Sequence, residues 1–244
     1  CLLLGMNEKK KMLYGLVTAE KRIPISAAEM REKEVRGVEF GITKMLMMEN
    51  AGSALARFVT CAFFEDKVMK KILLVAGTGN NGGDTFVAAR HLAHWNNEFS
   101  LSLVLVGKET DIRAEEALTN WKILKRVDSI NKLILDSPDK TNLLTELISS
   151  SHVIIVGISG TGFKGSPHEL QAKVIELINR SKGAKKLISV DIPSGMNADS
   201  GNFEAAVRSD YTITMDSPKV GLLASERARQ ICGEILVANI GLPC

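Results

Sequence analysis

Apolar runs alternate with segments of helical periodicity along most of the chain. A run such as 70–77 ("KKILLVAG") is short, continuous and ended by glycine, which is typical of a strand buried on both faces of a sheet. We expect strands at 70–77, 101–107, 131–136, 152–158, 186–193, 211–215 and 233–240, and helices at 26–41, 45–64, 86–95, 112–127, 141–150 and 167–181. Parallel strands need crossover helices, so this order predicts an α/β fold with a Rossmann-like, doubly wound, mostly parallel sheet and helices on both faces, in three layers.

The first predicted helix has clear boundary signals. Ser26 stands three positions before Glu29, the spacing of a capping box, and Gly41 stands where a helix would end. No linker interrupts the 244 residues, so we expect a single domain over 1–244, with residues 1–24 as an N-terminal extension.

Composition and charge narrow the classes of function. The formal net charge is +3 and aromatic residues make up 5%, so neither a basic face nor stacking rings indicate nucleic acid as a partner. No apolar run approaches the roughly 20 residues that a membrane helix needs. The four cysteines are far apart, which favours free thiols in a reducing compartment. We therefore expect a cytoplasmic protein with a small-molecule ligand.

Three polar loops follow predicted strands: 77–84 ("GTGNNGGD"), 159–165 ("SGTGFKG") and 194–201 ("SGMNADSG"). In an open α/β sheet the ligand binds outside the carboxyl ends of the strands. The three loops are therefore expected to lie along one edge and to form the ligand site together.

The first loop combines glycines with amide and carboxylate side chains. Gly77, Gly79 and Gly82 fit the GxGxxG pattern, which is weak support when it stands alone. Glycines let the backbone approach a phosphate, and a helix N-terminus supplies N–H groups and a positive dipole end. The polar members are Asn80, Asn81 and Asp84. A glycine-rich turn with Asp84 as a helix-start carboxylate explains the same residues without a ligand.

The other two loops each contain one charged candidate. Lys164 in the second loop could neutralise a phosphate, or it could be a solvated lysine on a surface turn. Asp191 ends an apolar strand directly before "IPSG", where a carboxylate faces the ligand crevice and suits proton transfer. The alternative is a structural aspartate that accepts hydrogen bonds from the following turn. His91 and His94 have no partner at ligand spacing and are expected to be packing or surface residues.

Taken together, six segments resemble the YjeF N-terminal family, the NAD(P)H-hydrate epimerases. They are "MENAG" (48–52), "GTGNNGGD", "GTGFKG", "VDIPSGMNADSG" (190–201), "SPKVGLL" (217–223) and the closing "IGLP". The segments occur in the family's order and span the chain from about Ile25 to Pro243. Each is weak alone, and their joint occurrence makes the resemblance specific.

The resemblance implies an isomerase that interconverts the R and S epimers of hydrated NADH or NADPH, in metabolite repair. The nucleotide would then be the substrate and not a cofactor. The family is often dimeric, and the S epimer passes to a dehydratase, which in many microbial relatives is fused to the same chain. Carried over by position, the substrate-binding residues would be Asn80, Asn81, Gly82, Gly83, Asp84, Gly160, Thr161, Gly162, Phe163, Lys164, Gly165, Ser166 and Asp191. Asp191 would also be the catalytic acid and base.

The family also binds potassium, and here the chain departs from the pattern. Asn81 and Ser194 fall at two of the ligand positions. The third, an aspartate in the family, is occupied by Val156, which has no oxygen to offer a hard cation. A potassium ion would have to depend on backbone carbonyls and water in its place.

Two other classes compete with the epimerase. A non-catalytic nucleotide-binding or dimerisation scaffold of the same fold would account for Val156 as the trace of a decaying site. Against it stands the retention of four polar residues, Asn80, Asn81, Asp84 and Asp191. An NAD-dependent dehydrogenase would need an acidic residue at the end of the strand 101–107, where Gly107 and Lys108 stand.

Overall fold

The computed structural model describes residues 15–63, 70–95 and 98–243. One eight-stranded sheet runs through it in the order β1-β8-β7-β6-β5-β2-β3-β4. The strands are β1 (Leu16–Thr18), β2 (Lys70–Ala76), β3 (Phe99–Val106), β4 (Ile130–Leu135), β5 (Val153–Gly157), β6 (Lys186–Val190), β7 (Tyr211–Met215) and β8 (Glu234–Ala238). All pairs are parallel except β1 with β8.

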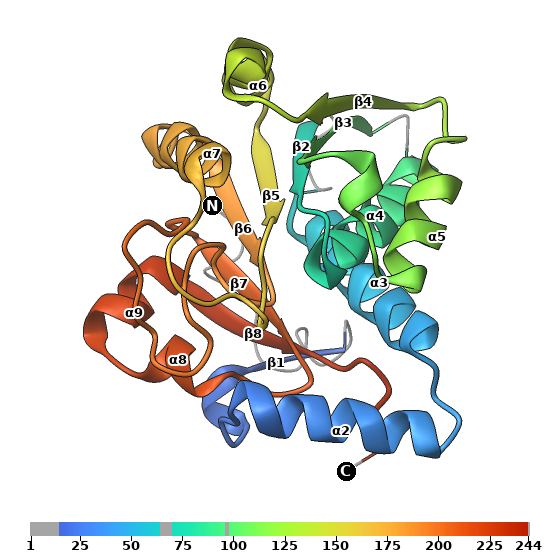
Figure 1. Ribbon diagram of the computed structural model, residues 1–244, viewed down its shortest axis with the longest axis vertical. Helices are drawn as coiled ribbons and strands as arrows, with labels where there is room; N and C mark the ends of the chain where they lie inside the picture. Colours follow the sequence, from blue (N-terminus) through green and yellow to red (C-terminus); the bar gives the residue numbers. More distant parts are fainter. Residues whose placement is uncertain (1–14, 64–69, 96–97, 244) are drawn as a thin grey trace.

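Helices cover both faces of this sheet, as the sequence predicts (Figure 1). They are α2 (Ala27–Glu39), α3 (Lys44–Phe63), α4 (Asn80–Leu92), α5 (Glu115–Leu124), α6 (Thr141–Ser150), α7 (Glu169–Arg180), α8 (Val220–Leu223) and α9 (Glu226–Cys232). Short 3-10 turns lie at Ala19–Lys21, Ala93–Trp95, Glu109–Asp111 and Pro138–Lys140. The α/β class, the doubly wound sheet and the three layers are confirmed.

Two apolar clusters pack the helices against the two faces of the sheet. Residues of α3, α4 and α5 pack with Leu74 and Ala76 on one face of the sheet, and residues of α6 and α7 pack with Val75 and Val156 on the other. Adjacent residues of β2 thus point to opposite faces, as the period of a strand requires. A third cluster lies under α8 and α9.

Several boundaries differ from the expectation, each for a local reason. The capping box of α2 is present, with the Glu29 backbone N–H donating to Ser26 Oγ. The helix predicted from residue 86 begins at Asn80, because Gly79 serves as its N-cap. The strand predicted to residue 193 ends at Val190, because Asp191 leaves the extended conformation. β1 lies in the segment expected to be an extension, and α8 and α9 had no periodicity long enough to predict them.

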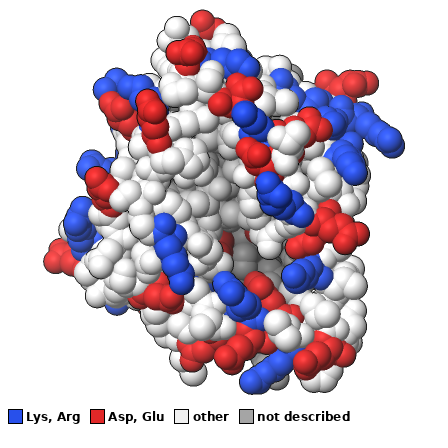
Figure 2. Space-filling model, in the orientation of Figure 1, with Lys and Arg blue, Asp and Glu red and all other residues white. Residues whose placement is uncertain are grey.

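The chain changes direction across the sheet between β2 and β5. It runs from β2 outward through β3 to β4, and then returns to β5 and runs outward through β6, β7 and β8. Such a switch point is where open α/β sheets hold ligands, outside the carboxyl ends of the strands. Figure 2 shows that basic and acidic side chains are interspersed around a hollow in the middle of the view. The described residues contain no helix long and apolar enough to cross a membrane.

Candidate functional site

Glycines bring the loops after β2 and β5 into backbone contact at the switch point. A Cβ at Gly77 would lie 2.0 Å from the carbonyl oxygen of Ile158, and one at Gly82 would lie 1.9 Å from the carbonyl oxygen of Gly77. No side chain fits at such distances. The first loop therefore folds tightly onto the start of α4, and it directs the N-terminus of that helix toward the carboxyl edge of the sheet.

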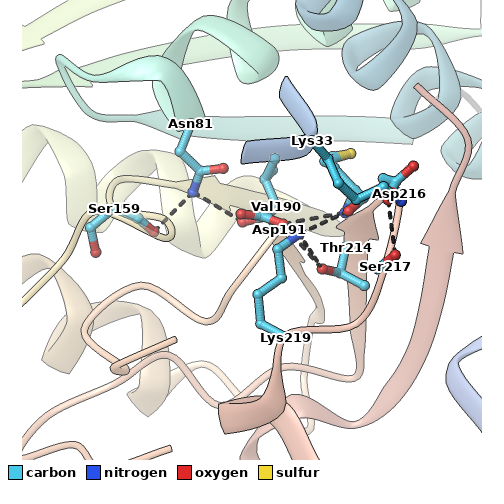
Figure 3. Close-up of polar contacts among 10 residues, drawn as sticks. Lys33, Asn81, Ser159, Val190, Asp191, Thr214, Asp216, Ser217 and Lys219 are labelled. Carbon is cyan, nitrogen blue, oxygen red and sulfur yellow. Dashed lines mark hydrogen bonds and ion pairs between the residues drawn. The ribbon is translucent and has the colours of Figure 1, made fainter. Parts of the chain in front are cut away.

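Asn81 links this helix start to the other two loops (Figure 3). Its Nδ2 donates to the carbonyl oxygen of Ser159 at 2.9 Å and to that of Val190 at 3.0 Å. The residue is 7% exposed, and its Oδ1 is buried without a hydrogen-bond partner. The side chain thus bridges the ends of β5 and β6 through two carbonyls and leaves one acceptor unsatisfied.

Asp191 occupies a strained backbone position at the end of β6. Its φ is +60°, and the Ile192 N–H donates to the Val190 carbonyl at 2.7 Å, which closes a three-residue turn around the aspartate. A non-glycine residue in this conformation costs on the order of 1–3 kcal/mol. The turn thus holds Asp191 at the carboxyl end of β6.

A buried lysine, which the sequence analysis did not predict at the site, forms an ion pair with the Asp191 carboxylate. Lys219 is 1% exposed, and its Nζ donates to Asp191 Oδ1 at 2.7 Å, to the Met215 carbonyl at 2.8 Å and to Thr214 Oγ1 at 3.2 Å. The Thr214 hydroxyl in turn donates to Asp191 Oδ1 at 3.1 Å, and the Met215 N–H donates to the same oxygen at 3.2 Å. Within the described part of the chain, every hydrogen bond to this carboxylate goes to Oδ1, so Oδ2 is left for a ligand.

The segment before α2 fixes the backbone on both sides of Lys219. The Ile25 N–H donates to the Pro218 carbonyl at 2.9 Å, and the Val220 N–H donates to the Ile25 carbonyl at 3.0 Å. Farther along α2, Lys33 pairs with Asp216 at 2.5 Å. Asp216 has φ +62° and forms the same kind of turn as Asp191, one strand away. α2 is thus tied to the segment that follows β7.

The charges of the Asp191–Lys219 pair act on two further carboxyl groups. Burial raises the pKa of Asp84 well above its ordinary value, and the charges of Asp191 and Glu34 raise it further. Burial likewise raises the pKa of Glu34 on α2, with the charge of Asp191 as the next contribution. Both groups keep a proton to higher pH than ordinary carboxyl groups do. The sequence predicted Asp84 at the site, and Glu34 was missed because only the course of α2 brings it there.

The remaining predicted residues differ in exposure, and Gly160, Thr161 and Phe163 are half-buried. Asn80, Gly162, Lys164, Gly165 and Ser166 are exposed, whereas Gly82 and Gly83 are buried in the first turn of α4. The Ser166 hydroxyl, directly after the second loop, donates to Glu204, which lies three residues after the third loop. Substrate contacts of these residues stay predictions. Away from the site, His91 lies 2.7 Å from Glu49 Oε1, and the described residues hold no His, Cys, Asp or Glu cluster suited to a metal.

Comparison with known proteins identifies the family of this chain. The family model for the YjeF-related protein N-terminus matches residues 44–221. An NAD(P)H-hydrate epimerase of Elusimicrobium minutum is 34% identical over 221 residues, which cover 90% of this chain and 96% of that protein. The chain belongs to the YjeF N-terminal family.

Longer relatives and a solved structure complete the comparison. A bifunctional NAD(P)H-hydrate repair enzyme of Archaeoglobus fulgidus is 36% identical over 219 residues, which cover 90% of this chain and 42% of that protein. This chain therefore spans less than half the length of that relative. A yeast protein of known crystal structure has a TM-score of 0.72 at 23% identity, over 85% of this chain and 86% of its own, which establishes the fold.

The residues at the three family potassium positions do not present the oxygens that such an ion needs. Asn81 directs its nitrogen, not its oxygen, at the carbonyls of Ser159 and Val190. The Ser194 hydroxyl oxygen accepts from the backbone N–H groups of Ile158 and Ser159, at 3.0 and 3.2 Å. Val156 is fully buried in the apolar cluster beside α6 and α7. A hard cation binds through oxygen, so this donor set does not fit it.

Proposed function

We propose that this chain is an isomerase that interconverts the R and S epimers of hydrated NADH and NADPH. The observation that carries the proposal is Asp191, which is held through one carboxylate oxygen by the buried Lys219 and directly follows β6, the strand beside β5 and the switch point. The epimerase of Elusimicrobium minutum, similar over nearly its whole length, supports the same activity.

Inversion requires the carbon–oxygen bond of the hydrate to break and to form again on the opposite face. The leaving hydroxyl takes the bonding electron pair and one proton and departs as water, while the ring nitrogen donates its lone pair to the carbon. Water then adds from the other face and gives up one proton. The Asp191–Lys219 pair exchanges this proton in both halves. No electron leaves the nucleotide, so the reaction needs no oxidant.

The loops provide binding and orientation for this chemistry. The start of α4 directs backbone N–H groups and a positive dipole end at the crevice, which suits the pyrophosphate of a dinucleotide. The exposed Lys164 of the second loop would neutralise a phosphate. Holding the nucleotide at both ends places the hydrated ring beside Asp191 Oδ2 and reduces the entropy cost of reaching the transition state.

Replacement of Asp191 by asparagine tests the catalytic assignment. The amide keeps the shape of the side chain but cannot exchange a proton, so we expect epimerisation to slow by about 10²-fold or more. The exposed Asp139→Asn, which makes the same chemical change at a distance, should retain the wild-type rate. An epimerisation rate of Asp191→Asn close to that of the wild type would refute the proposed role of Asp191 in proton exchange.

We also infer that the chain forms a homodimer in the cytoplasm and hands the S epimer to a dehydratase. Exposed apolar side chains on and beside α2 support a dimer, since a patch of this kind favours protein contact: Ile23, Val35, Val38, Phe40 and Leu46. The bifunctional relatives support a dehydratase as the partner. The mass in solution, measured by light scattering after size exclusion, tests the dimer.

A further inference from the structure

Two backbone carbonyls converge on one side-chain nitrogen where the ends of β5 and β6 meet. The carbonyl oxygens of Ser159 and Val190 lie 2.9 and 3.0 Å from Asn81 Nδ2, and both distances are those of good hydrogen bonds. An amide nitrogen carries two hydrogens, so it can satisfy both carbonyls at once. The contact joins three segments that are far apart in the sequence.

Only two arrangements of the Asn81 amide are compatible with these carbonyls. With the nitrogen inward, two hydrogen bonds form and Oδ1 remains buried without a partner, as observed. With the oxygen inward, three oxygens would face one another, and only a cation between them could relieve their repulsion, as carbonyl rings do in ion channels. The choice therefore depends on whether a cation is stable there.

The surrounding charges oppose a cation at this point. The Asp191 carboxylate follows Val190 directly, and the Lys219 ammonium 2.7 Å away already compensates its charge. The position from which the family supplies a carboxylate is Val156, an apolar residue in an apolar cluster. A buried potassium ion would thus add a positive charge beside a carboxylate that Lys219 already neutralises, which is costly at low dielectric.

We propose that the Asn81 amide nitrogen takes the place of the alkali-metal cation in this chain and joins the ends of β5 and β6 without potassium. Asn81 is then a positioning residue, because it fixes the Val190 carbonyl beside Asp191. If the proposed function holds, epimerisation proceeds at the same rate when potassium is replaced by an organic cation. The family's ion would have been lost together with its carboxylate, while the geometry that the ion supports is retained.

Thermal unfolding in potassium chloride and in choline chloride of equal ionic strength tests the proposal without substrate. A cation bound at 100 times its Kd would raise the wild-type Tm by about 5–10 °C, whereas we expect a change within about 1 °C. Asn81→Asp puts an oxygen against the two carbonyls, so its Tm in choline chloride should fall by roughly 5–10 °C and recover in part in potassium chloride. The exposed Asn80→Asp adds the same charge and should show no recovery.

Several results would overturn the proposal. A saturable rise of the wild-type Tm with potassium is one, and equal Tm values of Asn81→Asp in both salts is another. If Asn81→Asp does not fold, the test is anomalous diffraction from wild-type crystals soaked in thallium(I), a heavy analogue of potassium. An anomalous peak between the Ser159 and Val190 carbonyls contradicts the proposal, and its absence there supports it. A wild-type chain inactive in both salts would count against the epimerase function only.

Discussion

Loss of the Lys219 ammonium should destabilise the protein far more than loss of an ordinary lysine. Lys219→Met keeps the length and packing of the side chain but leaves the Asp191 carboxylate, 10% exposed, without its partner at 2.7 Å. Breaking a buried pair by removing one member costs about 3–5 kcal/mol. For a chain of this size each kcal/mol shifts Tm by roughly 2–4 °C, so the Tm should fall by about 6–20 °C.

A surface ion pair provides the matched control. Lys182 lies 3.4 Å from Asp210, with side chains 33% and 26% exposed, and pairs of this kind contribute about 0–1 kcal/mol. Lys182→Met should therefore unfold close to the wild type in urea. Lys219→Met, Asp191→Asn and the double variant form a cycle whose coupling free energy should reach about 1–3 kcal/mol. A Lys219→Met protein within about 1 kcal/mol of the wild type, or an additive cycle, would refute the buried pair.

Three further predictions concern pH, packing and helix capping. The raised pKa of Asp84 means that the folded state binds more protons than the unfolded state from about pH 4 up to that pKa, so this group lowers stability as pH rises through that window. At pH 7, Asp84→Asn should therefore unfold at a higher urea concentration than the wild type. At about pH 4 the two proteins should unfold at the same urea concentration. An equal difference at both pH values would contradict this reasoning. Gly82→Ala should lose about 1–3 kcal/mol in urea unfolding, whereas Gly79→Ala, whose Cβ would meet nothing within 4 Å, should be tolerated, and equal losses would count against the tight loop. Ser26→Ala removes the α2 cap and should cost about 1 kcal/mol in the same assay, and no loss would show that the cap is not formed in solution.

The sequence predicts those parts of the fold that depend on local pattern. The continuous apolar runs mark β2 to β8 because parallel strands are buried on both faces, and the Ser26–Glu29 spacing marks the start of α2. β1 has three residues, and its place beside β8 depends on pairing with a segment more than 200 positions away, which no local pattern records.

The site likewise contains residues that the sequence predicts and residues that it does not. Asn81, Asp84 and Asp191 could be predicted because each follows a strand and the carboxyl ends of parallel strands meet at one edge. Lys219 could not, because a lysine in a short polar segment is usually solvated, and its burial results from contacts with β6, β7 and the segment before α2. The available signal was the segment "SPKVGLL" (217–223), which contains Lys219 and begins two residues after β7 ends.

The most direct test of the account starts from a single pure epimer. The S form of hydrated NADH is incubated with the purified chain, and the R form is followed by chromatography against a buffer blank. We expect the chain to bring the two epimers to equilibrium far faster than buffer does, from either starting epimer and without formation of oxidised nucleotide. Equilibration at the blank rate by folded protein would contradict the epimerase assignment and favour a non-catalytic module of the same fold.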